Sequence, residues 1–159
     1  MTGRRDLSFD RLDQIMPEVD RLLAGHTTAG SWTFGQMLYH LATAVRLTTL
    51  GSRRPPEEPG SQAARTAEVY RKRFFQSGRF PEGAEAPIPI LIPPADADER
   101  AEAESLRSAL LRFERSEGPF PAHPMLGPLT KDEWAAFHRI HSAHHLGFVG
   151  PSPGTTNPR

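Results

Sequence analysis

The sequence contains no cysteine among its 159 residues. Without cysteine the chain can form no disulfide, offers no thiolate nucleophile and cannot build a sulfur-ligated zinc site. Any bound metal ion must therefore be held by histidine, aspartate or glutamate, a donor set that suits borderline ions such as zinc, nickel or iron.

The sequence also lacks a charge imbalance and a long apolar run. Lysine plus arginine and aspartate plus glutamate each number 19, so the formal net charge is zero. This balance gives no basic surface of the kind that nucleic acid requires. No segment approaches the roughly 18 apolar residues of a membrane span, and the first residues, MTGRRDLSFDRLDQ, have no apolar signal core. We therefore expect a cytoplasmic protein with no nucleic-acid or membrane partner.

Apolar residues recur at helical spacing in several segments, and capping patterns mark where some of these segments begin. Thr33 with Gln36 and Thr130 with Glu133 form capping boxes, and Asp96 with Glu99 resembles a further cap. The pattern predicts four principal helices and a weaker one at residues 62–77. The four lie at about 13–25, 33–50, 96–116 and 130–146.

Sixteen prolines favour long irregular connections, above all at 79–94, and no segment reads as a convincing strand. The expected fold class is all-α, an antiparallel four-helix bundle with one extra short helix and long proline-rich connections. We expect one domain over residues 8–149 and a disordered tail over 150–159.

Four of the seven histidines lie in the segment HRIHSAHHLGF, residues 138–148. At about 100° per residue, His141 and His145 lie one turn apart within an aromatic, buried stripe of the last helix, where both could reach one ion. Two buried imidazoles without partners would carry a desolvation penalty, which favours metal ligation over a core role. The alternative is a half-buried surface histidine or a core histidine bonded to a carbonyl. Ser142 occupies the position at which zinc proteases of the HExxH type have their catalytic glutamate. The sequence therefore excludes a protease of this type.

A catalytic metal site commonly uses three protein ligands, and His40 is the candidate for the third. His40 lies at the edge of the apolar face of the second helix, where the small Ala44 leaves space; the alternative is an ordinary boundary histidine. No catalytic residue or general base can be named. The other histidines rank lower. His26 is expected in a solvated turn, His123 on a loop surface or above the site, and His138 and His144 at the margins of the stripe.

The segments GSWTFGQMLYHLATAV and HPMLGPLTKDEWAAFHRIHSAHHLGF resemble the DinB-like superfamily, in particular a branch described only as a domain of unknown function. Trp32, His40, His141 and His145 occupy the positions of its motif. The resemblance covers most of residues 8–149. It implies a four-helix bundle that binds zinc or nickel through the three histidines, and it leaves a homodimer open. One departure is the run LGF after His145, where many members have an Arg-Gly-Gln-like run.

Three functions are consistent with these observations. The first is a metal-dependent transferase or hydrolase with an open coordination position, whose small-molecule substrate is a low-molecular-weight thiol, as the resemblance implies for some members. The second is a non-catalytic metal-binding or stress-associated helical protein, in which the ion mainly ties two helices together. The third is a helical interaction domain whose histidines bind no metal.

Overall fold

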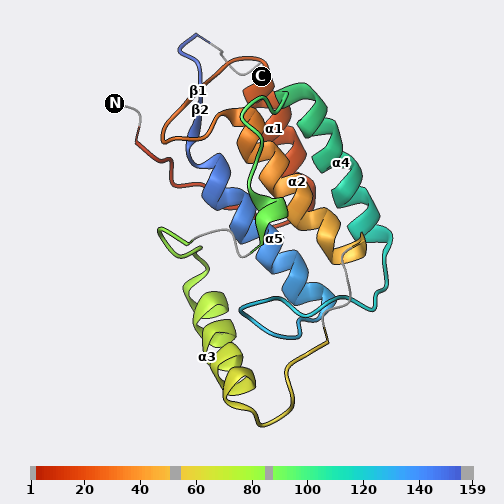
Figure 1. Cartoon of the computed structure of the whole chain (residues 1–159). Helices are drawn as coiled ribbons and strands as arrows, with labels where there is room; N and C mark the ends of the chain where they lie inside the picture. The colour runs from red at the N-terminus through yellow and green to blue at the C-terminus, as the bar shows by residue number, and fades with distance from the viewer. Residues whose placement is uncertain (1–2, 51–54, 85–87, 155–159) are drawn as a thin grey trace.

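The computed structural model describes residues 3–50, 55–84 and 88–154, and it is mostly helical, as expected (Figure 1). Five α-helices are present in these ranges: α1 (Ile15–Leu23), α2 (Phe34–Leu50), α3 (Gln62–Ser77), α4 (Glu99–Arg115) and α5 (Lys131–Leu146). Two short 3-10 turns accompany them, η1 (Leu12–Gln14) and η2 (Pro89–Leu91), together with the strands β1 (His26–Thr28) and β2 (Val149–Pro151). None of the described helices is long and apolar enough to cross a membrane.

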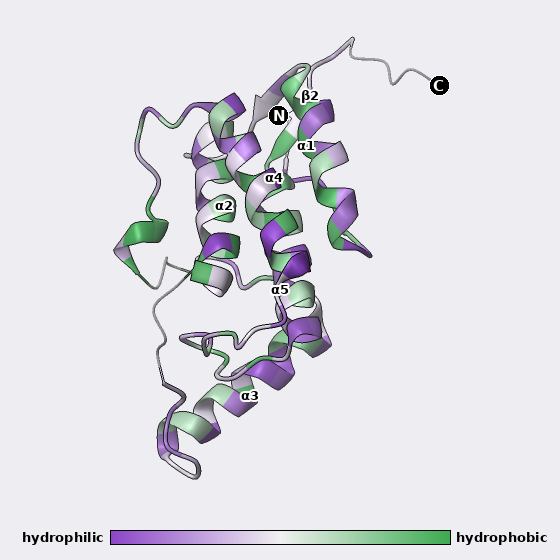
Figure 2. Ribbon diagram, turned by 90° about the vertical axis from the view of Figure 1, so that its right-hand side faces the viewer, coloured by the Kyte–Doolittle hydropathy of each residue, from purple (hydrophilic) through white to green (hydrophobic). Residues whose placement is uncertain are grey.

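Helices α1, α2, α4 and α5 pack against one another, and α2 packs most extensively on α4. Side chains from all four meet in the core, among them Ile15, Leu38, Leu106 and Leu146, which are fully buried. Helix α3 stands apart at the other end of the molecule, joined by two long connections, in both Figure 1 and Figure 2. Phe74 is the one buried residue of α3. The core that positions the histidines therefore comes from the other four helices.

Both capping boxes predicted from the sequence are confirmed. At the start of α2 the Gln36 N–H donates to Thr33 Oγ1 (3.1 Å), and the Thr33 N–H donates to Gln36 Oε1 (2.9 Å). At the start of α5 the Glu133 N–H donates to Thr130 Oγ1 and the Thr130 N–H donates to Glu133 Oε1, each at 3.1 Å. Each box satisfies two backbone donors that the helix itself cannot use.

The predicted starts of two other helices were wrong. Helix α4 is capped by Asp98, whose side chain accepts from the Ala101 N–H at 2.8 Å, and not by Asp96. Two aspartates two residues apart both satisfy the cap pattern, and Glu99 three residues after Asp96 favoured the wrong one. Around residue 13 the chain forms the 3-10 turn η1, and α1 begins only at Ile15.

A small antiparallel sheet joins the segment before α2 to the segment after α5. We did not predict this sheet from the sequence. His26 pairs with Pro151, Thr27 with Gly150 and Thr28 with Val149. Three-residue strands are too short to give a readable alternation. The expected tail boundary at residue 150 therefore falls inside β2, and the Ser152 N–H donates to the Gly25 carbonyl beyond it. Residues 155–159 of that tail lie outside the described residues.

Gly35 lies where α2 passes the turn before α4. A Cβ at this position would lie 2.1 Å from the Ala97 carbonyl oxygen. In a helix interior alanine is more favourable than glycine by about 1 kcal/mol. We nevertheless expect Gly35→Ala to lower the free energy of unfolding by about 1–3 kcal/mol, because the backbone at Ala97 must move to admit the new Cβ. Urea denaturation measures the change.

The matched control is Ser108→Ala on the exposed side of α4, which we expect to change stability by no more than about 0.5 kcal/mol. A Gly35→Ala protein as stable as the unsubstituted chain would contradict the close approach of α2 to Ala97.

Candidate metal centre

The three predicted ligands are brought together between α2 and α5. His40 comes from α2, His141 and His145 come from α5, and one ligand nitrogen from each lies within 4.8 Å of the others. His141 Nε2 lies 3.0 Å from His40 Nε2 and 3.1 Å from His145 Nε2. Around a tetrahedral zinc ion with Zn–N distances of about 2.0–2.1 Å, ligand nitrogens are separated by roughly 3.3 Å. Two of the three separations lie close to this value, and all three nitrogens lie within 4.8 Å of one another, so the histidines could hold one ion.

The orientation of His40 is fixed by a backbone carbonyl. His40 Nδ1 lies 2.7 Å from the Leu91 carbonyl oxygen in η2. A carbonyl only accepts hydrogen bonds, so Nδ1 carries the proton and the neutral ring presents the Nε2 lone pair to the other two histidines. In metal-binding histidines the ring N–H that does not face the metal commonly donates to a carbonyl or carboxylate in this way, and the hydrogen bond orients the ring.

His141 occupies the middle of the cluster and is only 4% exposed. Its Nε2 can hold one proton and can donate it to one neighbour, whereas a cation can accept lone pairs from all three rings at once. Among the described residues, the cluster contains no carboxylate. A divalent ion bound here would therefore keep its full double charge.

The environment keeps these rings neutral. Burial, followed by the neighbouring imidazoles, holds the pKa of His141 and of His145 well below the ordinary histidine value. Burial also lowers the pKa of His40, and the hydrogen bond to Leu91 opposes this shift. All three nitrogens are consequently available to a metal ion at neutral pH.

Two aromatic rings wall the cluster. The Trp32 ring lies nearly parallel to His145, with centroids 5.6 Å apart at an interplanar angle of 15°. The Phe80 ring stacks on His141, with centroids 4.8 Å apart at 26°. His145 is the least buried of the three histidines.

The sequence indicated the ligands but missed two residues that position them. Phe80 and Leu91 both belong to the connection between α3 and α4, which the sequence predicted only as an extended cover over the helices. Leu91 acts through its carbonyl, a group that every residue carries, and Phe80 has no spacing relation to the histidines. No sequence signal could have identified either one.

Two further histidines lie near their expected positions, and one of them is more buried than expected. His26 was predicted to be solvated, yet it is half-buried: Nδ1 lies 3.1 Å from the Leu22 carbonyl oxygen and Nε2 lies 3.4 Å from Glu99 Oε2. His144 is half-buried beside the centre, with its ring against Phe80 and against Phe148. Neither belongs to the converging group.

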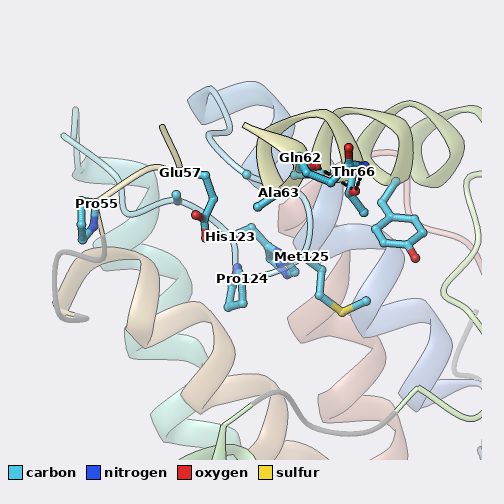
Figure 3. Close-up of a pocket in the computed structure, with 12 residues that line it drawn as sticks. Pro55, Glu57, Gln62, Ala63, Thr66, His123, Pro124 and Met125 are labelled. Carbon is cyan, nitrogen blue, oxygen red and sulfur yellow. Dashed lines mark hydrogen bonds between the residues drawn. The ribbon is translucent and has the colours of Figure 1, made fainter. Parts of the chain in front are cut away.

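His123 does not lie above the metal centre. It lines a separate cavity of about 450 Å³ between α3 and the loop 122–127 (Figure 3). Its Nδ1 accepts the backbone N–H groups of Met125 and Leu126, each at 3.1 Å, so this ring holds its own loop. The Phe137 ring lies 4.7 Å from the His123 ring and 5.4 Å from that of His141, so it stands between the cavity and the centre.

His138, predicted at a margin of the stripe, is 1% exposed. Its ring lies between Trp134 and Phe113, and neither ring nitrogen has a hydrogen-bond partner among the described residues. Burial lowers the pKa of His138 to about 3. The ring therefore behaves as a neutral core side chain.

A family model matches residues 1–152, nearly the whole chain, and its description is "Protein of unknown function (DUF1569)". The chain belongs to the DUF1569 family. No curated protein and no solved structure matches it. Because the DUF1569 description assigns no activity, the chemistry has to be argued from the geometry of the centre.

The buried His138 predicts a specific loss of stability in acid. With the folded pKa at about 3 and an unfolded value of about 6.5, the unfolded state binds the proton first. Stability is therefore fully present above about pH 6.5 and falls toward pH 3, by about 1.4 kcal/mol per pH unit for this group. We expect His138→Phe to reduce the slope of unfolding free energy against pH by that amount between about pH 5.5 and 4.

Phe113→Leu is the control, because it alters the packing around the same ring without removing a titrating group. It should lower stability and leave the slope unchanged. An unaltered slope in His138→Phe would show that this imidazole is not held neutral.

Proposed function

We propose that the chain binds one divalent transition-metal ion through His40, His141 and His145 and uses the remaining coordination position for transfer or hydrolysis of a small molecule. The convergence of three neutral ring nitrogens within 4.8 Å, beside the rings of Trp32 and Phe80, is the observation that supports this function. Imidazole ligands suit borderline ions, and zinc or nickel is the ion that the resemblance to the DinB-like superfamily implies.

An ion in such a site lowers the pKa of a water or thiol that binds it. The chain itself has no cysteine, so any thiol in the reaction belongs to the substrate, and a low-molecular-weight thiol is the proposed substrate. The three histidines hold the ion, the Leu91 carbonyl orients His40, and Trp32 and Phe80 limit the access of water.

We also propose that the fold is the antiparallel four-helix bundle of the DinB-like superfamily, with α3 as the additional helix. The packing of α1, α2, α4 and α5 supports this assignment. So do the positions of the histidines on α2 and α5.

A non-catalytic role is the second candidate, and one observation favours it. The ligands come from two helices, α2 and α5, so a bound ion would tie those helices together. Its binding free energy would then appear as folding stability.

Metal content tests the ligand set directly. We expect about one equivalent of zinc or nickel in protein produced without an affinity tag and with both metals supplied. His141→Ala and His145→Ala should lose the metal, since two imidazoles hold a divalent ion much less tightly than three. Elemental analysis provides the measurement.

His144→Ala is the matched control, because His144 lies next to His145 in the chain but outside the converging group. It should retain the metal. A content below about a tenth of an equivalent in the unsubstituted protein would refute the proposed centre, and unchanged content in His141→Ala would refute the ligand assignment.

The catalytic and structural candidates differ in turnover. For an enzyme we expect metal-dependent conjugation of small thiols with chlorodinitrobenzene, lost in His40→Ala and followed by absorbance. For a structural ion we expect no turnover, together with a gain of about 2.7 kcal/mol in unfolding free energy at a metal concentration 100 times its dissociation constant. Turnover that is equal with and without metal would contradict the catalytic role.

A further inference from the structure

A cation that the proposed function does not use lies near the ligand His145. The guanidinium carbon of Arg4 lies 5.4 Å from the centroid of the Phe148 ring. The Phe148 ring lies 5.6 Å from that of His144, which lies 4.9 Å from the ligand His145. Burial is the main cause that lowers the pKa of both histidines, and the charge of Arg4 contributes to the same shift.

The next residue in the chain holds Arg4 at this place. The Arg5 backbone N–H donates to the Gly147 carbonyl at 2.7 Å, and its Nε donates to the Val149 carbonyl at 2.6 Å. Its Nη2 also donates to Glu18 Oε1 at 2.7 Å. A Cβ at Gly147 would lie 3.0 Å from the Arg5 carbonyl oxygen, so glycine permits this close crossing. The N-terminal segment is thereby fixed against the end of α5, with Arg4 over the Phe148 ring.

The present partner of Arg4 is replaceable. Its guanidinium pairs with Glu82, whose side chain is 78% exposed, while that of Arg4 is 34% exposed. Ion pairs as exposed as this one contribute about 0–1 kcal/mol. An incoming anion can therefore take the place of Glu82 at little cost.

The charges around the centre favour an anion. Three neutral ligands leave a divalent ion its double charge, Arg4 adds a second positive group, and the aromatic faces of Phe80 and Phe148 lie at His144 between them. We propose that the substrate is a small organic anion with two ends: a donor atom for the open coordination position, and a carboxylate, joined by an apolar spacer, that binds Arg4. This inference rests on the proposed function and makes Arg4 the residue that determines specificity.

Cobalt-loaded protein and two thiols of equal length test the proposal. The probes are 6-mercaptohexanoate and 6-mercaptohexanol, which differ only in the carboxylate, and thiolate-to-cobalt absorption reports their binding. We expect the carboxylate to bind about tenfold more tightly, as a charge-assisted hydrogen bond predicts. Arg4→Gln should remove this preference and leave the affinity for the alcohol within about twofold, while Arg4→Lys should keep part of it.

Two further variants sharpen the result. Glu82→Gln releases Arg4 from its partner and should increase the preference for the carboxylate. Arg65→Gln on α3 is the control and should leave the preference unchanged. Equal affinities for the two probes in the unsubstituted protein, or an undiminished preference in Arg4→Gln, would overturn the inference while the metal centre stands. Failure of the unsubstituted protein to bind cobalt would instead overturn the metal centre and, with it, this inference.

Discussion

The candidate centre depends on the convergence of three imidazole nitrogens inside an apolar interior. Such nitrogens cannot all satisfy one another, because each neutral ring brings only one proton. The packing of α2 and α5 and the hydrogen bond from His40 to Leu91 impose this arrangement. Burial of the rings beside one another also lowers the pKa values of His141 and His145, and among the described residues no carboxylate joins the group. Together they describe a site suited to a cation rather than a hydrogen-bonded core.

The seven histidines show that residue type alone does not decide the role of an imidazole. His26 and His40 each lie against a backbone carbonyl, whereas His123 accepts from two backbone amides and lines a different cavity. His138 has no hydrogen-bond partner among the described residues and is enclosed by aromatic rings. His26 Nε2 faces Glu99 Oε2 and His40 Nε2 faces His141 Nε2, so the group at Nε2, and not the carbonyl at Nδ1, separates the potential ligand from the structural residue.

Local patterns could be predicted from the sequence, and contacts between distant segments could not. The capping boxes at Thr33 and Thr130 involve residues three positions apart, so each can be recognised within four consecutive residues of the sequence. The pair His141 and His145 was visible for the same reason, since one helical turn separates them. The choice of Asp98 over Asp96 depends on where the chain turns after the prolines, and the roles of Leu91, Phe80 and Arg4 depend on tertiary approach. Those features have no periodic signal.

The order of these elements along the chain has a consequence for how the centre is completed during synthesis. His40 is translated early, while the other two histidines, Gly147 and the strand that pairs with β1 all follow residue 140. A nascent chain that ends before α5 presents a lone imidazole and an unpaired edge. Because two of the three candidate ligands are the last to be made, the three-histidine group can form only after α5 has been synthesised.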